Sequence, residues 1–148
     1  MGHARTLVDR YWAMVESGDW DGLRQIHAPD TELILPGPGG TRQRFTGVEP
    51  VIEVLKAYRV AFPDFFHNIQ TTTEDGDRIV IEMKVGGTHT GPFATPGGEL
   101  PPTGRRLDIG AVDVVTLAYG KVQSWHTYFD QVEYLTQLGL MPSLQEVG

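Results

Sequence analysis

The chain has no cysteine among its 148 residues. Disulfide bonds, thiolate nucleophiles and cysteine-ligated metals are therefore excluded. Serine is also scarce, and no Gly-x-Ser-x-Gly motif is present, so we do not expect Ser-His-Asp hydrolysis. Because no two histidines have the spacing of metal ligands, no metal site is predicted. The histidines are His3, His27, His67, His89 and His126.

Basic residues are outnumbered, with 12 Lys and Arg against 19 Asp and Glu and a formal net charge of −7. This balance argues against nucleic-acid binding, because phosphate recognition needs a basic surface. The sequence contains no apolar run typical of a transmembrane helix or signal peptide, which favours a cytoplasmic protein without membrane association. Phosphate-binding and dinucleotide-binding glycine motifs are also missing, and no cofactor is predicted.

Hydrophobic residues make up 40% of the chain, and its length favours a single domain spanning residues 1–148. Apolar spacing predicts a first helix that Gly18 ends and a second, capped by Asp19, over 20–27. Alternation and turn residues predict the remaining elements. They are a strand over 30–35, a stop at 36–40, a helix over 47–62, strands over 65–73 and 78–89 joined at Asp75-Gly76, a flap over 92–104, a hairpin of 105–117 and 121–130, and a short helix capped by Asp130 and ending at Gly139.

Asp113 is the unusual residue of the last hairpin, because it alternates with apolar residues and should face the core. A three-residue turn at 118–120 would place it opposite Trp125, whereas a two-residue turn would place it opposite His126. We favour the first, which puts Trp125 and Phe129 inside and His126 and Asp130 outside. A carboxyl group on such a face should have a raised pKa, since burial disfavours its anion.

The order of these elements, together with three motifs, resembles the SnoaL-like polyketide cyclases of the nuclear-transport-factor-like superfamily. The motifs are Gly-Thr-His-Thr-Gly-Pro-Phe at 87–93, Pro-Pro-Thr-Gly-Arg-Arg at 101–106, and Trp-x-x-Tyr-Phe-Asp at 125–130. The resemblance implies an α+β fold in which a curled, mixed or antiparallel sheet is closed by N-terminal helices around an apolar pocket. It also implies a homodimer that pairs through the outer face of the sheet, where Val112, Val114 and Tyr128 are expected.

The catalytic positions of related pocket enzymes are altered here. The acid/base aspartate of SnoaL-type cyclases, like that of limonene-epoxide hydrolases, falls on Thr127, whose hydroxyl titrates too high to act as a base. The first helix is similar to that of ketosteroid isomerases, whose carbonyl-binding tyrosine matches Tyr11. The isomerase base falls on Leu35, and its second donor falls near Asp113, which matches a pocket histidine of SnoaL-like cyclases.

We therefore expect a cofactor-independent cyclase or isomerase that acts on a small apolar or polyketide-like substrate. Tyr11 and a neutral Asp113 would polarise a substrate carbonyl, as in ketosteroid isomerase, an example of a carboxylic acid kept protonated. The alternatives are a non-catalytic protein that binds an apolar ligand and, third, an epoxide hydrolase. His89 could line the pocket or hold the flap. The expected substrate-binding residues are Trp12, Val15, Leu35, Phe62, His89, Ile109, Ala111, Trp125, Thr127 and Phe129.

Overall fold

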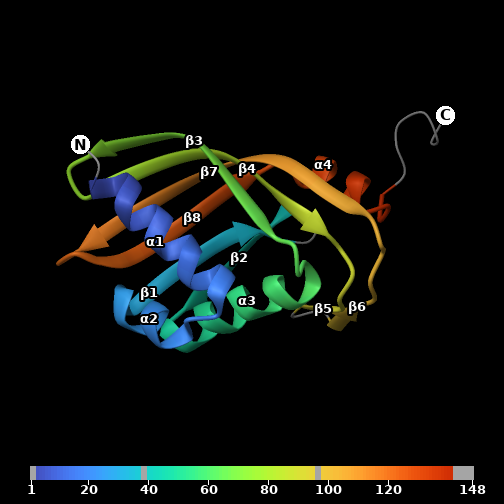
Figure 1. Ribbon diagram of the computed structural model, residues 1–148, viewed down its shortest axis with the longest axis horizontal. Helices are drawn as coiled ribbons and strands as arrows, with labels where there is room; N and C mark the ends of the chain where they lie inside the picture. The colour runs from blue at the N-terminus through green and yellow to red at the C-terminus, as the bar shows by residue number, and fades with distance from the viewer. Residues whose placement is uncertain (1–2, 38–39, 96–97, 142–148) are drawn as a thin grey trace.

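The computed structural model describes residues 3–37, 40–95 and 98–141, so parts of the predicted stop at 36–40 and of the flap at 92–104 lie outside the described residues. Most of the helical residues lie in the first half of the chain and most of the strands in the second (Figure 1). In order they are α1 His3–Ser17, α2 Trp20–Ile26, β1 His27–Pro36, β2 Arg42–Thr46, α3 Val48–Ala61, β3 Phe66–Asp75, β4 Arg78–Thr88, β5 Phe93–Thr95, β6 Gly98–Leu100, β7 Arg106–Ala118, β8 Lys121–Phe129 and α4 Gln131–Gln137.

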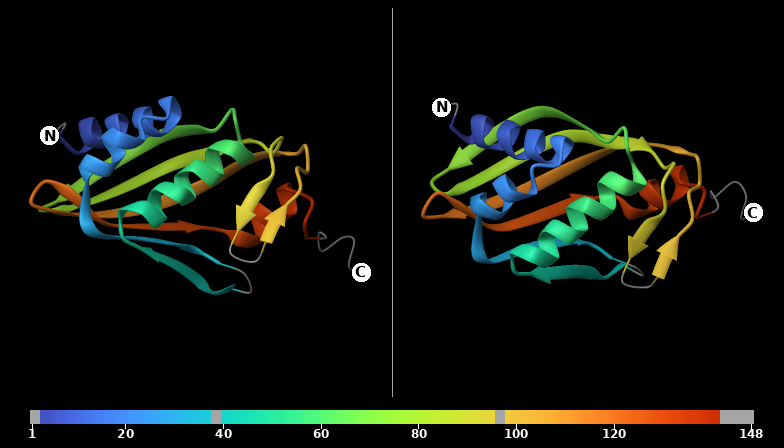
Figure 2. Two further views of the ribbon diagram at one scale, coloured as in Figure 1. Left: turned by 90° about the horizontal axis from the view of Figure 1, so that it is seen from below. Right: turned by 60° about the horizontal axis from the view of Figure 1, so that its bottom comes forward.

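The main sheet has the strand order β2-β1-β8-β7-β4-β3. Neighbouring strands are antiparallel except β1 and β8, which are parallel. The sheet curls, and α1 and α3 lie against one of its faces (Figure 2). The core forms between these helices and the concave face of the sheet. The predicted α+β fold, a curled mixed sheet covered by N-terminal helices, is confirmed.

The helix boundaries follow local signals in the sequence. The Asp19 carboxylate accepts a hydrogen bond from the Gly22 amide at 3.0 Å and caps α2. Asp130 accepts from the amides of Val132 and Glu133 and caps α4. A carboxylate at these positions satisfies amides that have no partner within the helix. Both predicted caps are confirmed. No helix in the described ranges combines the length and apolar character needed to cross a membrane.

Three strands were not predicted. β2 pairs with β1 at the edge of the sheet, and β5 pairs with β6 in a separate two-stranded sheet within the region expected to be a flap loop. The β2 sequence Arg-Gln-Arg-Phe-Thr is mostly polar, and its burial alternates only between exposed and half-buried. Such an edge strand gives a weak hydrophobic signal. The turn after β3 also lies one residue later than predicted, because Asp75 already pairs with Arg78.

The register of the last hairpin differs from both predicted alternatives. Its turn consists of Tyr119 and Gly120, with φ values of 53° and 77°, as in a two-residue type I′ turn. The register then shifts between Thr116 and Leu117, so that Asp113 lies opposite Thr127. A bulge of this kind adds one residue to β8 and reverses which side chains face the core. For this reason Trp125 is still inside, as predicted, although its expected partner was wrong.

The outer face of β7 and β8 carries the residues expected to form a dimer interface. Val112 is the cross-strand partner of Tyr128, and both alternate with inward-facing neighbours. Val112 and Val114 are half-buried, whereas Tyr128 is 42% exposed and lies beneath the guanidinium of Arg42. The homodimer remains a prediction.

Gly86 on β4 allows the closest approach between two strands at the pocket wall. A Cβ atom at this position would overlap the backbone carbonyl of Leu107, which cannot rotate away. Gly110, on the neighbouring strand β7, would have no atom within 4 Å of an added Cβ. The two glycines therefore differ in their steric surroundings while both belong to the same sheet.

We expect Gly86→Ala to lower the free energy of unfolding by about 3 kcal/mol or more, because the added methyl group meets backbone atoms. Gly110→Ala is the matched control and should change stability by less than about 1 kcal/mol. Urea unfolding of both variants measures the difference. Equal stability of the two variants would contradict the close approach at Gly86.

Candidate functional site

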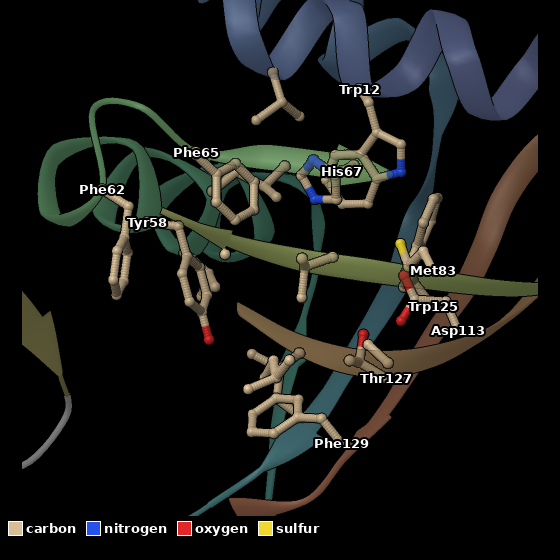
Figure 3. Close-up of a pocket in the computed structure, with 18 of the residues that line it drawn as sticks. Trp12, Tyr58, Phe62, Phe65, His67, Met83, Asp113, Trp125, Thr127 and Phe129 are labelled. Carbon is tan, nitrogen blue, oxygen red and sulfur yellow. The ribbon is translucent and has the colours of Figure 1, made fainter. Parts of the chain in front are cut away.

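A cavity of about 90 Å³ lies between the concave face of the sheet and helices α1 and α3. We call it the inner cavity; Figure 3 shows the side chains around it. The residues around it include both predicted catalytic residues and every predicted binding residue except His89. They are Tyr11, Trp12, Val15, Leu33, Leu35, Val54, Leu55, Tyr58, Phe62, Phe65, His67, Met83, Val85, Gly86, Leu107, Ile109, Ala111, Asp113, Trp125, Thr127 and Phe129.

Asp113 supplies a carboxyl group to this otherwise apolar wall. It is 2% exposed, and its Oδ2 accepts a hydrogen bond of 2.7 Å from Trp125 Nε1. Its Oδ1 is buried without a partner in hydrogen-bonding geometry. The carbonyl-type oxygen of a neutral acid is the better acceptor, so the Trp125 bond favours placing the acid's proton on Oδ1. The neutral acid then carries its O–H at Oδ1, beside the Thr127 side chain.

Burial raises the pKa of Asp113 from its ordinary value of 3.8 to about 7. The side chains of Trp125 and Thr127 oppose this change because they interact favourably with the anion. Desolvation has the larger effect, because removing the charged carboxylate from water costs more free energy than its interactions with these two side chains recover. At neutral pH, protonated and ionised Asp113 are therefore similarly populated.

Tyr11 lines the cavity with its ring but uses its hydroxyl elsewhere. The ring stacks on Trp125 at a centroid distance of 4.4 Å, and the hydroxyl oxygen lies 3.1 Å from Nε2 of His27. His27 Nδ1 must donate to the Leu23 carbonyl at 2.7 Å, and burial lowers the pKa of His27. The neutral ring thus accepts at Nε2, and Tyr11 donates to it. The Tyr11 hydroxyl proton, which the sequence analysis expects to be donated to a substrate carbonyl, is therefore donated to His27 instead.

Tyr58, on α3, was not predicted as a site residue. Its hydroxyl points into the cavity (Figure 3). Burial, together with the nearby Asp113, raises the pKa of Tyr58 to about 12. The phenol is therefore protonated at neutral pH and can donate a hydrogen bond. Tyr58 shares the buried helix face of Val51, Leu55 and Phe62, and a polar tip on such a face was the signal available in the sequence.

His67, on β3, is a second residue that the sequence analysis missed. Its ring stacks on Trp12 at 3.6 Å and meets the edge of Phe65 at 4.1 Å. Nδ1 is buried without a partner, as is Nε1 of Trp12. Burial lowers the pKa of His67 to about 3, so the imidazole is neutral at physiological pH. His67 adds a polar but uncharged group to the wall.

His89 does not line the cavity, which corrects one predicted binding residue. It is fully buried, and its Nδ1 accepts a hydrogen bond from the Thr103 amide at 3.2 Å. Its own amide donates to the Arg105 carbonyl. Of the two roles left open, the structure therefore supports the one in which His89 fastens the segment before β7. Over the described ranges, no three His, Asp or Glu side chains cluster as metal ligands do.

The raised pKa of Asp113 makes a prediction about stability. Between about pH 4 and pH 7, the folded state keeps the proton while the unfolded state has released it. His67, whose pKa is lowered to about 3, contributes a rise in the free energy of unfolding over much of this range. Asp113 should contribute a fall of about 4 kcal/mol through the same range, for a shift of this size. Asp113→Asn should remove this fall, which urea unfolding at pH 4 to 8 would measure.

Asp108→Asn is a suitable control because Asp108 lies on the same strand with its side chain 51% exposed. Its pH profile should follow that of the unmodified protein. If Asp113→Asn has the same pH dependence as the unmodified protein, Asp113 does not hold a proton in the folded state.

Comparison with known proteins identifies the family. The model of the SnoaL-like polyketide cyclases matches residues 5–138. IdmH from Streptomyces antibioticus, a proposed polyketide cyclase, is 27% identical with a TM-score of 0.71, covering 93% of this chain and 99% of that one. A proposed SnoaL-like polyketide cyclase from Jannaschia sp. CCS1 is 26% identical with a TM-score of 0.73, covering 86% and 83%.

AclR from Streptomyces galilaeus, a proposed hydroxylase, shares the fold at 22% identity, with a TM-score of 0.73 and coverage of 99% and 91%. No curated protein matches the chain. The family model extends over nearly all described elements, from α1 to α4. The chain therefore belongs to the SnoaL-like polyketide cyclase family.

Proposed function

We propose that the protein is a cofactor-independent cyclase or isomerase that acts on a polyketide-like substrate in the inner cavity, with Asp113 polarising the reacting carbonyl. One observation carries the proposal: a buried carboxyl group that lines an apolar cavity has one oxygen held by Trp125 and the other, beside Thr127, without a partner in hydrogen-bonding geometry. Donors fixed in a site that excludes water stabilise a developing oxyanion more than water does.

Tyr58 is the second donor in this proposal, in place of the Tyr11 of the sequence-based hypothesis. The hydroxyl of Tyr58 faces the cavity, whereas that of Tyr11 donates to His27. Asp113 raises the pKa of both phenols, so its carboxyl group interacts electrostatically with each of them. Tyr11 then serves to hold Trp125, on whose ring it stacks, and Trp125 in turn holds Asp113.

The chemistry balances without an added base at Thr127. In an intramolecular aldol closure, the enol carbon of a 1,3-dicarbonyl attacks a ketone; a C–C bond forms and the ketone π bond breaks. Asp113 gives its proton to the new alkoxide and takes the proton released by the enol hydroxyl. A pKa near 7 suits a group that must both give and take a proton at neutral pH. An isomerisation would use the same exchange.

The test uses an aryl β-ketoester with an acyl group ortho to its side chain, which closes to a naphthol that absorbance can follow. Asp113→Asn should lower kcat/KM by about 10²-fold to 10³-fold, because an amide cannot pass a proton to the alkoxide. Tyr58→Phe should lower it by about 10²-fold. Full turnover by Asp113→Asn would reject the proposed role of Asp113.

The Tyr11→Phe variant distinguishes the role of the Tyr11 hydroxyl from that of the Tyr58 hydroxyl. It should keep turnover within a few-fold of the unmodified protein, yet lower the free energy of unfolding by about 1–3 kcal/mol, because Nε2 of His27 loses its donor. A larger catalytic loss for Tyr11→Phe than for Tyr58→Phe would restore the original assignment. If no ester is turned over but the ester raises the melting temperature, the non-catalytic binding function is correct. Hydrolysis of an epoxide by the protein would instead support the third alternative.

A further inference from the structure

A second cavity, of about 400 Å³, adjoins the first. We call it the outer cavity; it lies among α3, β2 and β5, and Leu35, Val54 and Tyr58 line both cavities. The boundary between the two spaces is therefore made of side chains from β1 and α3. The remaining lining residues of the outer cavity are Gln43, Phe45, Pro50, Glu53, Ala57, Phe93 and Ala94.

The volumes of the two cavities limit what each can hold. An apolar cavity of about 150 Å³ holds one benzene molecule, whereas the inner cavity has about 90 Å³. It cannot enclose even one aromatic ring without expanding. The outer cavity, at about 400 Å³, lies within the range of about 300–1,000 Å³ usual for small-molecule sites. A substrate with several rings or a long chain must therefore extend beyond the inner cavity.

We infer that the outer cavity is a second substrate subsite, so that the substrate spans both cavities past Leu35, Val54 and Tyr58. This inference rests on the proposed function. The reacting carbonyl enters the inner cavity beside Asp113, and the remainder of the same molecule occupies the space between α3, β2 and β5. Tyr58, at the boundary, touches the substrate where the two parts join.

The lining of the outer cavity indicates the chemistry of that remainder. Phe45, Phe93 and Pro50 offer apolar contacts, and the edge of Phe93 meets Tyr58 at a centroid distance of 5.0 Å. Gln43 and Glu53 are the polar residues of this wall, and Glu53 pairs with Lys56 at 3.6 Å. The remainder is therefore mostly apolar and able to carry a hydroxyl that donates to Glu53 or Gln43.

A series of linear methyl ketones of increasing chain length tests the inference by binding alone. The quenching of Trp12 and Trp125 fluorescence, confirmed by calorimetry, would give each Kd. If the cavities act as one path, Kd should fall about fourfold for each added methylene, because each buried methylene contributes about 0.8 kcal/mol. The fall should continue after the ketone exceeds the length that the inner cavity can hold.

Two variants test whether the added methylenes of the long ketones lie in the outer cavity. Ala57→Phe places a ring in the outer cavity only, and should weaken long ketones by about tenfold or more while leaving short ones unchanged. Val54→Ala widens the boundary and should strengthen long ketones more than short ones. Ala111→Val is the control on the inner side, and should weaken all chain lengths alike, since Ala111 lines only the inner cavity.

Three results would overturn the inference: a Kd that stops falling at the shortest ketones, an equal effect of Ala57→Phe on short and long ketones, or no binding of any methyl ketone. The failure of the proposed function would look different. In that case Asp113→Asn keeps full turnover of the aryl β-ketoester, while the dependence of Kd on chain length and its change in Ala57→Phe remain.

Discussion

The hydrogen bond from Trp125 Nε1 to Asp113 Oδ2 holds the polar centre of an otherwise apolar cavity. A carboxyl group removed from water is costly as an anion, and one indole donor does not offset that cost. The acid is therefore still partly protonated near neutral pH, and its second oxygen is buried without a partner in hydrogen-bonding geometry. The ring of Tyr11 stacks on Trp125 and helps to fix its position. The Tyr11 hydroxyl is itself hydrogen-bonded to His27.

In the proposed function, the concave face supplies acid–base chemistry although position 127, where the resemblance places the aspartate of SnoaL-type cyclases, is a threonine. Asp113 and Thr127 are direct cross-strand partners, so a carboxyl group on β7 reaches the region that the usual residue on β8 would serve. Tyr58, from α3, lines the same cavity.

Much of the architecture could be predicted from local patterns, and the errors have physical causes. The apolar spacing of α1 and the aspartate caps of α2 and α4 depend on residues close in sequence, and these predictions were correct. The hairpin register depends on a bulge in β8 that the turn residues do not indicate, so the sequence analysis paired Asp113 with the wrong residue. The contact between the Tyr11 hydroxyl and His27 could not be predicted either, because the two residues are brought together by the packing of α1 against the start of β1.

The sequence by itself determined the class of fold, the apolar concave face and the presence of one acid on it, because alternation along a strand decides which side chains share a face. Only the tertiary structure decided which oxygen of that acid Trp125 holds, which phenol is bound to His27 and how the space divides into two cavities. Those properties depend on side chains that α1, α3 and β8 bring together from distant parts of the chain. Their distances are set by packing, which no local pattern encodes.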